Sequence, residues 1–290
     1  MIALDRMALA DVGPHPARLA REVIAQIEGS HGKVPLPIPV DEIAIGAGIV
    51  EIKRVESAAF EGILVQDDAK QAGVIAVNRR SSPERARFTV SHELGHFLHP
   101  LHEGGQFACT KADLVLAVAT RDDQRGTREV EANIFAAELL MPERLVAPLL
   151  RRRGSPEIGT ILSLHRDYGV SKEAASRRFV ALQRESCAVV FSREGKVRGL
   201  ARGAGFPYIG LSRDDRISPT SLTKRFGDLI GKVSEQAEAV PSEWRISSEG
   251  GSLWEEVLVQ EEGHRLTLLV WEPDDEETRE EARSWKPQFR

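Results

Sequence analysis

The chain has 290 residues, of which 41% are hydrophobic and 29% charged, with a formal net charge of −5. These proportions are typical of a folded protein with one large domain or two to three smaller ones, and they exclude a collagen-like, disordered or strongly DNA-coating chain. Only Cys109 and Cys187 are present, too few for a disulfide framework, and the charged N-terminus does not resemble a signal peptide or a membrane anchor, so we expect a cytoplasmic protein.

Two helices and a small sheet are predicted before residue 80. Residues 17–28 carry apolar side chains at helical spacing, and a proline-rich stretch separates this helix from a second one that begins near Val40. Between residues 49 and 78, β-branched runs alternate with polar or glycine-containing turns. This pattern predicts a small antiparallel sheet.

A long helix follows the sheet. Ser82 as the N-cap and Pro83 at the first helical position predict its start, and Pro100 ends it. The next stretch of about 25 residues is predicted to be a loop, and so long a loop inside a compact domain is usually functional. Two more helices are then predicted, over residues 126–140 and 142–151.

The remainder of the chain comprises a helical segment followed by a segment rich in predicted strands. Residues 151–185 contain two helical stretches separated near Gly169, with Ser171 as the N-cap of the second, which predicts a helix-turn-helix segment. Its excess of basic residues fits either DNA contact or a solvated helical face. After residue 186, strands and turns dominate, with one helix near residues 220–236, and this pattern indicates a separate α+β domain.

The long helix carries the chemistry. His92, Glu93 and His96 form the pattern H-E-x-x-H, and a separation of four residues places both imidazoles on one face of a helix, where they can share a metal ion. An apolar stripe on the same helix predicts that it is buried, where histidines and a glutamate without a partner cost several kcal/mol. A bound metal would compensate for that cost. Gly95 leaves room for a second helix to approach.

The third ligand is predicted to come from the helix over residues 126–140. Glu129 lies on the same narrow face as Asn133, flanked by small side chains. Two histidines and a carboxylate leave Zn²⁺ a fourth position for water, which is the arrangement of a catalytic site. Glu93 is then expected to accept the proton of that water and pass it to the leaving amine, and Asn133 to orient a ligand.

Other third ligands remain open. His102 has the spacing of the third histidine of metzincins, but His99 stands where those enzymes have a glycine, and the proline after it pushes His99 into an extended conformation. His99 itself lies about 10 Å along the helix from His92, too far to share its ion. The alternatives to Glu129 are Glu131, His102 and either Asp122 or Asp123.

Two segments, RFTVSHELGHFLH at 87–99 and EVEANIFAAELLMP at 129–142, resemble the ImmA/IrrE family of bacterial metallopeptidases, and the resemblance extends over about residues 35–182. It implies an α+β, zincin-like domain in which His92, His96 and Glu129 bind zinc and Glu93 is the base. Mn²⁺ could substitute for the zinc. The part after residue 186 resembles, in architecture alone, the radiation-response regulators IrrE (PprI) of Deinococcus.

The resemblance also implies an organisation and a function. We expect a zinc metallopeptidase domain over residues 1–150, a helix-turn-helix segment over 151–185 and a GAF-like sensor domain over 186–290. The enzyme would be a gluzincin-like endopeptidase that cleaves a helix-turn-helix repressor of the DdrO (XRE) type and so induces the response to DNA damage, radiation and desiccation. The alternative is a DNA-binding transcriptional regulator with a ligand-sensing C-terminal domain.

Overall fold

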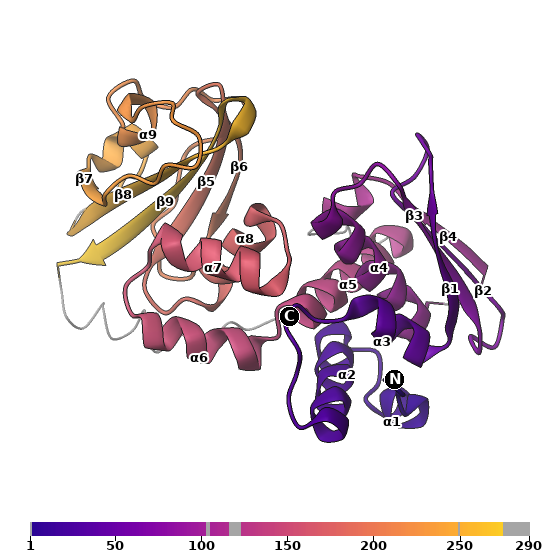
Figure 1. The fold of residues 1–290 in the computed structure, drawn as a ribbon. Helices are drawn as coiled ribbons and strands as arrows, with labels where there is room; N and C mark the ends of the chain where they lie inside the picture. Colours follow the sequence, from indigo (N-terminus) through magenta and orange to yellow (C-terminus); the bar gives the residue numbers. More distant parts are fainter. Residues whose placement is uncertain (1, 103–104, 116–122, 249, 275–290) are drawn as a thin grey trace. The chain divides into compact units, whose positions relative to one another are not determined.

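The structure is a computed structural model that describes residues 2–102, 105–115, 123–248 and 250–274. The chain folds into two compact units (Figure 1). Unit 1 comprises residues 1–143 and 165–171, and unit 2 comprises residues 144–164 and 172–290. The mixed α+β class predicted from the sequence is confirmed, whereas the division into three domains stays a prediction.

Unit 1 places helices on a small sheet. Its helices are α1 (Arg6–Asp11), α2 (Pro16–His31), α3 (Val40–Ala47), α4 (Pro83–Leu98), α5 (Gln124–Leu140) and a short 3₁₀ helix, η1 (Asp113–Val115). Its strands are β1 (Ile49–Val55), β2 (Gly62–Gln66), β3 (Gly73–Asn78) and β4 (Gly105–Cys109), in the order β1-β3-β2-β4.

The sheet of unit 1 corrects two expectations. Strand β2 is antiparallel to both β3 and β4, but β1 is parallel to β3, so the sheet is mixed and not purely antiparallel. The reason is that β2 and β3 pair as a hairpin, and β1 joins the free edge of β3 instead of pairing with β2. Strand β4 lies in the stretch predicted to be a loop, and it forms the edge of the sheet beside β2.

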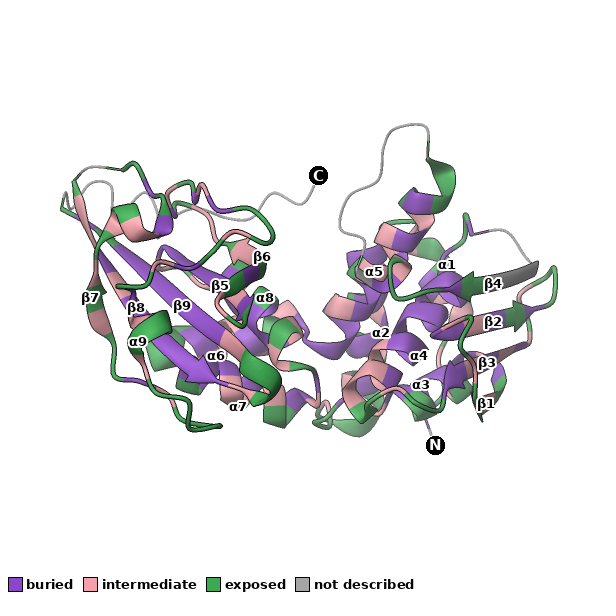
Figure 2. Ribbon diagram, turned by 90° about the horizontal axis from the view of Figure 1, so that it is seen from above, coloured by how far each residue is buried: buried purple, intermediate pink, exposed green. Residues whose placement is uncertain are grey.

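The core of unit 1 lies around α4. The helix packs against α3, α5 and strands β2 and β3, and an unbroken run of buried residues extends from Thr89 to Leu98 (Figure 2). This burial is more complete than an amphipathic stripe alone would give, because neighbours cover the helix on several sides. The motif residues are therefore inside the core and not on its rim.

Unit 2 is built on a five-stranded antiparallel sheet in the order β6-β5-β9-β8-β7. Its strands are β5 (Cys187–Arg193), β6 (Lys196–Arg202), β7 (Ala237–Ala239), β8 (Gly251–Val259) and β9 (His264–Pro273). The helices after α5 are α6 (Glu143–Arg153), α7 (Ile158–Tyr168), α8 (Lys172–Leu182), α9 (Leu222–Arg225), η2 (Pro241–Trp244) and η3 (Glu261–Gly263).

The helix predicted near residues 220–236 is wrong beyond Arg225. Only the single turn of α9 is helical, after Ser221 has capped it, and the chain then continues as turns and loop. Gly227 follows directly after the helix end, and Gly231 has a φ of +82°, a conformation that a right-handed helix cannot contain. Within the described part of the chain, no helix has the length and apolar character needed to span a membrane.

Candidate metal centre

Helix α4 begins and ends where its sequence predicts. The Ser82 hydroxyl accepts a hydrogen bond from the backbone N–H of Arg85, and Pro83 occupies the first turn. The last helical residue is Leu98, because His99 precedes a proline and is extended, with φ −70° and ψ 120°. These two signals fix the length of the helix that carries the motif.

Helix α5 comes unusually close to α4 at Gly95. A Cβ atom on Gly95 would lie 3.1 Å from the ring of Phe135 and 3.3 Å from the Cα atom of Ala132. Such distances are tighter than most Cβ contacts, so the glycine permits the approach that the sequence predicts. The same approach brings Glu129, one turn before Ala132, to the motif histidines.

Three ligand atoms converge between the two helices. His92 Nε2 lies 3.0 Å from Glu129 Oε2 and 3.1 Å from His96 Nε2, and His96 Nε2 lies 3.7 Å from the same Glu129 oxygen. Bonds of about 2.0–2.2 Å in tetrahedral geometry place the ligand atoms of zinc roughly 3.3–3.6 Å apart. The triangle of donor atoms therefore has the size that one such ion requires.

The other ring nitrogen of His92 is held by Asn133. The Asn133 side-chain N–H donates to the carbonyl oxygen of Asp113 at 2.8 Å, which turns its Oδ1 toward His92 Nδ1 at 2.9 Å. Because Oδ1 can only accept, Nδ1 carries the proton and Nε2 keeps a lone pair. This contact directs that lone pair into the triangle.

Glu93 lies beside the triangle in a closed environment. Its side chain is fully buried, the Cys109 thiol donates to Oε1 at 2.8 Å, and Oε2 has no hydrogen-bond partner among the described residues. Burial raises the pKa of Glu93 to about 7, although the neighbouring His92 opposes the shift. A carboxyl group with such a pKa is suited to accepting and returning a proton near neutral pH.

The chemistry of the donor set also fits a cation. In the metal-free protein, burial disfavours ionisation of Glu129, but its contacts with the rings of His92 and His96 outweigh burial and hold the pKa of Glu129 below its usual range. Burial lowers the pKa of His96 to about 4, so His96 is neutral at pH 7. Neutral imidazoles and an ionised carboxylate are the forms that bind zinc.

The rival ligands lie elsewhere. His102 contacts the outer nitrogen of His96, Nδ1 to Nδ1 at 2.9 Å, and Glu131 contacts His102 instead of the triangle. Asp123 caps the N-terminus of α5 by accepting from the Gly126 N–H at 2.8 Å. Asp122 lies outside the described residues. Among the described candidates, only Glu129 joins both motif histidines in one group.

The sequence does not predict the contact between Cys109 and Glu93. Cys109 is in β4, in register with Gly62 of β2, and a Cβ on Gly62 would lie 2.5 Å from Glu93 Oε1. The missing side chain of Gly62 therefore makes the space that Glu93 occupies. No sequence pattern predicts this arrangement, because the sequence predicts a loop where strand β4 lies.

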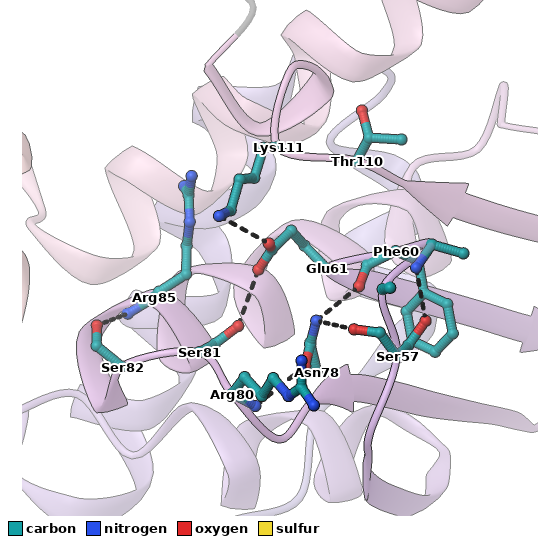
Figure 3. A pocket seen from close by; sticks show the side chains of 12 residues that line it. Ser57, Phe60, Glu61, Asn78, Arg80, Ser81, Ser82, Arg85, Thr110 and Lys111 are labelled. Atoms are coloured by element: carbon teal, nitrogen blue, oxygen red, sulfur yellow. Dashed lines mark hydrogen bonds and ion pairs between the residues drawn. The ribbon is translucent and has the colours of Figure 1, made fainter.

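A cavity of about 620 Å³ is lined in part by sequence neighbours of Gly62 and Cys109 (Figure 3). Glu61 precedes Gly62 in the chain and Thr110 follows Cys109, and both line the cavity. Figure 3 shows the Glu61 carboxylate between Ser81 Oγ, at 2.8 Å, and Lys111 Nζ, at 3.9 Å. The cavity is thus polar and lies along the chain next to the residues that border Glu93.

Comparisons with known proteins agree with the motif segments. Residues 53–180 match the family model Peptidase_M78, described as an IrrE N-terminal-like domain, so the predicted resemblance is confirmed. The chain is 36% identical to the radiation response metalloprotease IrrE of Deinococcus radiodurans over 86 residues, which cover 28% of the chain and 23% of that protein. It is 32% identical to the protein of the same name from Deinococcus deserti over 124 residues, 41% of the chain and 39% of the relative.

The matches to these relatives are partial, since they span less than two fifths of either relative's length. Among solved structures, a transcriptional regulator of Mycobacterium tuberculosis is similar with a TM-score of 0.49 and 16% sequence identity, over 92% of this chain and 74% of that one.

Proposed function

We propose that this chain, which carries an IrrE N-terminal-like domain over residues 53–180, is a zinc-dependent endopeptidase with His92, His96 and Glu129 as metal ligands and Glu93 as the catalytic base. The observation that carries the proposal is the triangle of three donor atoms, 3.0 to 3.7 Å apart, formed by residues of two different helices. The buried carboxylate of Glu93 lies next to that triangle, and its Oε2 has no hydrogen-bond partner within the described part of the chain.

The residues divide the work of peptide hydrolysis. Zinc, when bound, would supply a Lewis acid that polarises the peptide carbonyl and activates a water molecule. Glu93 accepts the proton of the attacking water at Oε2 and returns it to the nitrogen of the leaving amine. Cys109 donates to Oε1 and so leaves Oε2 as the oxygen that is free for this transfer. The protein interior around Glu93 excludes bulk water from the proton that is moved.

The proposed substrate is a helix-turn-helix repressor of the DdrO (XRE) type, whose cleavage would induce the response to DNA damage, radiation and desiccation. Two features support this choice: the match to the IrrE N-terminal-like domain, and relatives whose names describe a radiation response metalloprotease. We further propose that α7 and α8 form the helix-turn-helix segment, and that the antiparallel sheet of unit 2 belongs to a GAF-like sensor domain.

The test compares wild type, Glu93→Gln and Glu42→Gln on a purified DdrO-type repressor, with and without added Zn²⁺ or Mn²⁺, and detects cleavage by mass spectrometry. Glu42 is exposed on α3, so its substitution is a matched control for loss of one carboxylate. We expect wild type and Glu42→Gln to cut the repressor and Glu93→Gln to bind metal without cutting. If metal-loaded wild type leaves the repressor intact, the proposal is wrong, and binding of DNA by the intact chain becomes the next measurement.

A further inference from the structure

A chain of contacts leads from the outer side of His96 to the protein surface. His96 Nε2 faces the triangle of donor atoms, and its other nitrogen, Nδ1, lies 2.9 Å from His102 Nδ1. On the far side of that ring, His102 Nε2 lies 2.8 Å from Glu131 Oε2. The histidines follow one another at the C-terminal end of α4, and Glu131 comes from α5, two residues after Glu129.

The proton positions along this chain follow from the first link. Two Nδ1 atoms at hydrogen-bond distance need one proton between them, so one ring donates and the other accepts. If His96 uses the lone pair of Nε2 for a metal, its Nδ1 must carry the proton. His102 then accepts at Nδ1, carries its own proton on Nε2 and donates it to the Glu131 carboxylate. The three contacts are satisfied together by this single arrangement.

The surroundings hold His102 in this orientation. Its side chain is 1% exposed, although the residue lies just past the helix end, where the neighbouring Leu101 is 63% exposed. The ring of His99 stacks on it at 4.0 Å between centroids, and His99 Nε2 is in turn 2.5 Å from the carbonyl oxygen of Pro14. A polar ring buried this completely requires partners for both nitrogens, and the chain of contacts supplies them.

We propose that His102 and Glu131 are positioning residues for the metal ligand His96. They fix the tautomer that has its lone pair on His96 Nε2, they set the ring plane, and the carboxylate increases the basicity of the ligand through the intervening ring. Together with Asn133 on His92, each motif histidine is then held from its outer nitrogen. The inference rests on the proposed metal centre, but it concerns metal binding and not the identity of the substrate.

A second metal ion on His99, His102 and Glu131 is the competing explanation of this cluster. Two features oppose it. A shared ion needs the in-plane lone pairs of both rings to converge, whereas these rings are stacked with planes only 30° apart, and the carbonyl oxygen of Pro14 already faces His99 Nε2. In addition, His102 Nε2 carries a proton if its Nδ1 accepts from His96, so no lone pair remains there for an ion.

The experiment measures zinc affinity by competition with a chelator, in the full chain and without substrate. His102→Leu removes the acceptor of His96 Nδ1, and we expect a loss of affinity of about 10- to 100-fold. His102→Asn places a side-chain oxygen near the position of Nδ1 and is expected to keep most of the affinity. Glu131→Gln keeps an acceptor but loses the charge, so an intermediate loss is expected. His31→Leu, on the exposed end of α2, is the control and keeps wild-type affinity.

Imidazole ¹⁵N NMR of the zinc-loaded wild type provides a readout that a merely structural role would not give. We expect a proton on His96 Nδ1 and on His102 Nε2, and one zinc ion per chain. A proton on His102 Nδ1, two bound ions, or wild-type affinity in His102→Leu would overturn the inference. Should His102→Leu fail to fold, the NMR result and the Glu131→Gln affinity decide. A wild type that binds no zinc would instead refute the proposed function, which separates the two failures.

Discussion

Replacing Gly62 by alanine is the sharpest single test of how the sheet positions the proposed base. An added Cβ would lie 2.4 Å from Thr89 Cγ2, 2.5 Å from Glu93 Oε1 and 3.0 Å from Cys109 Sγ. Restoring ordinary contact distances requires a displacement on the order of 1 Å, in a region where α4 is buried on several sides. Overpacking of this kind typically costs about 1–3 kcal/mol of stability.

The larger effect of Gly62→Ala is expected on activity. A misplacement of about 1 Å can reduce the rate by about 100-fold, and the Glu93 carboxylate is one of the groups that must move. The three atoms nearest to the new methyl group belong to Thr89, Glu93 and Cys109 and not to the ligand triangle, so zinc affinity should stay near that of wild type. The assay is therefore kcat for repressor cleavage beside zinc affinity and the melting temperature.

Gly29→Ala is the matched control. Gly29 is on α2, a Cβ there would meet nothing within 4 Å, and alanine in a helix is favoured over glycine by up to about 1 kcal/mol. We expect unchanged kcat and equal or higher stability. If Gly62→Ala cleaves the repressor as fast as wild type, the idea that this glycine makes room for the base is refuted.

Four further outcomes are expected. Glu129→Ala removes one of the three donor atoms, so its zinc affinity should fall by more than the roughly 100-fold seen for changes outside the ligand shell, measured with a chelator. Cys109→Ser keeps a donor to Glu93 and should retain activity. Cys109→Ala leaves a buried oxygen without its donor, which should cost about 1–3 kcal/mol, seen either in the activation free energy derived from kcat or in the free energy of unfolding. In the metal-free protein, burial raises the pKa of Glu93 from 4.5 to about 7, so the folded state binds that proton more tightly than the unfolded chain does. Compared with Glu93→Gln, wild type should therefore lose up to about 3 kcal/mol of stability as pH rises from 4.5 through 7. A difference in denaturant midpoints between the two proteins that does not change with pH would contradict this. Trp244→Ala, in the core of unit 2, should cost about 3–5 kcal/mol there and leave zinc affinity unchanged.

Local signals in the sequence are sufficient to predict where helix α4 begins and ends. The Ser82 cap, the first-turn Pro83 and the proline after His99 act within one turn of the residues they control, so the boundaries could be predicted without tertiary information. Spacing alone likewise placed both motif histidines on one side of the helix. The approach of α5 at Gly95 could be anticipated as well, because a glycine inside a helix needs a packing reason.

Pairings between distant segments were not predictable in the same way. Strand β4 has five residues, and its placement depends on the antiparallel register with β2, which no local pattern in residues 105–109 specifies. The parallel pairing of β1 with β3 likewise depends on which edge of the hairpin is free. The helix predicted near residues 220–236 is wrong beyond Arg225, where Gly227 and Gly231 are the local signals against a longer helix.

The same distinction separates the proposed ligands from the residues that tune them. Spacing is enough to find His92, His96 and, on the second helix, Asn133, which contacts His92. The other groups that contact the motif, Cys109 from β4 and His102 from beyond the helix end, are brought to it by the tertiary fold. None of these contacts changes the pattern H-E-x-x-H. A chain can therefore keep the motif and still lose its metal affinity or its base, so an intact motif is a weaker criterion for activity than an intact set of buried partners.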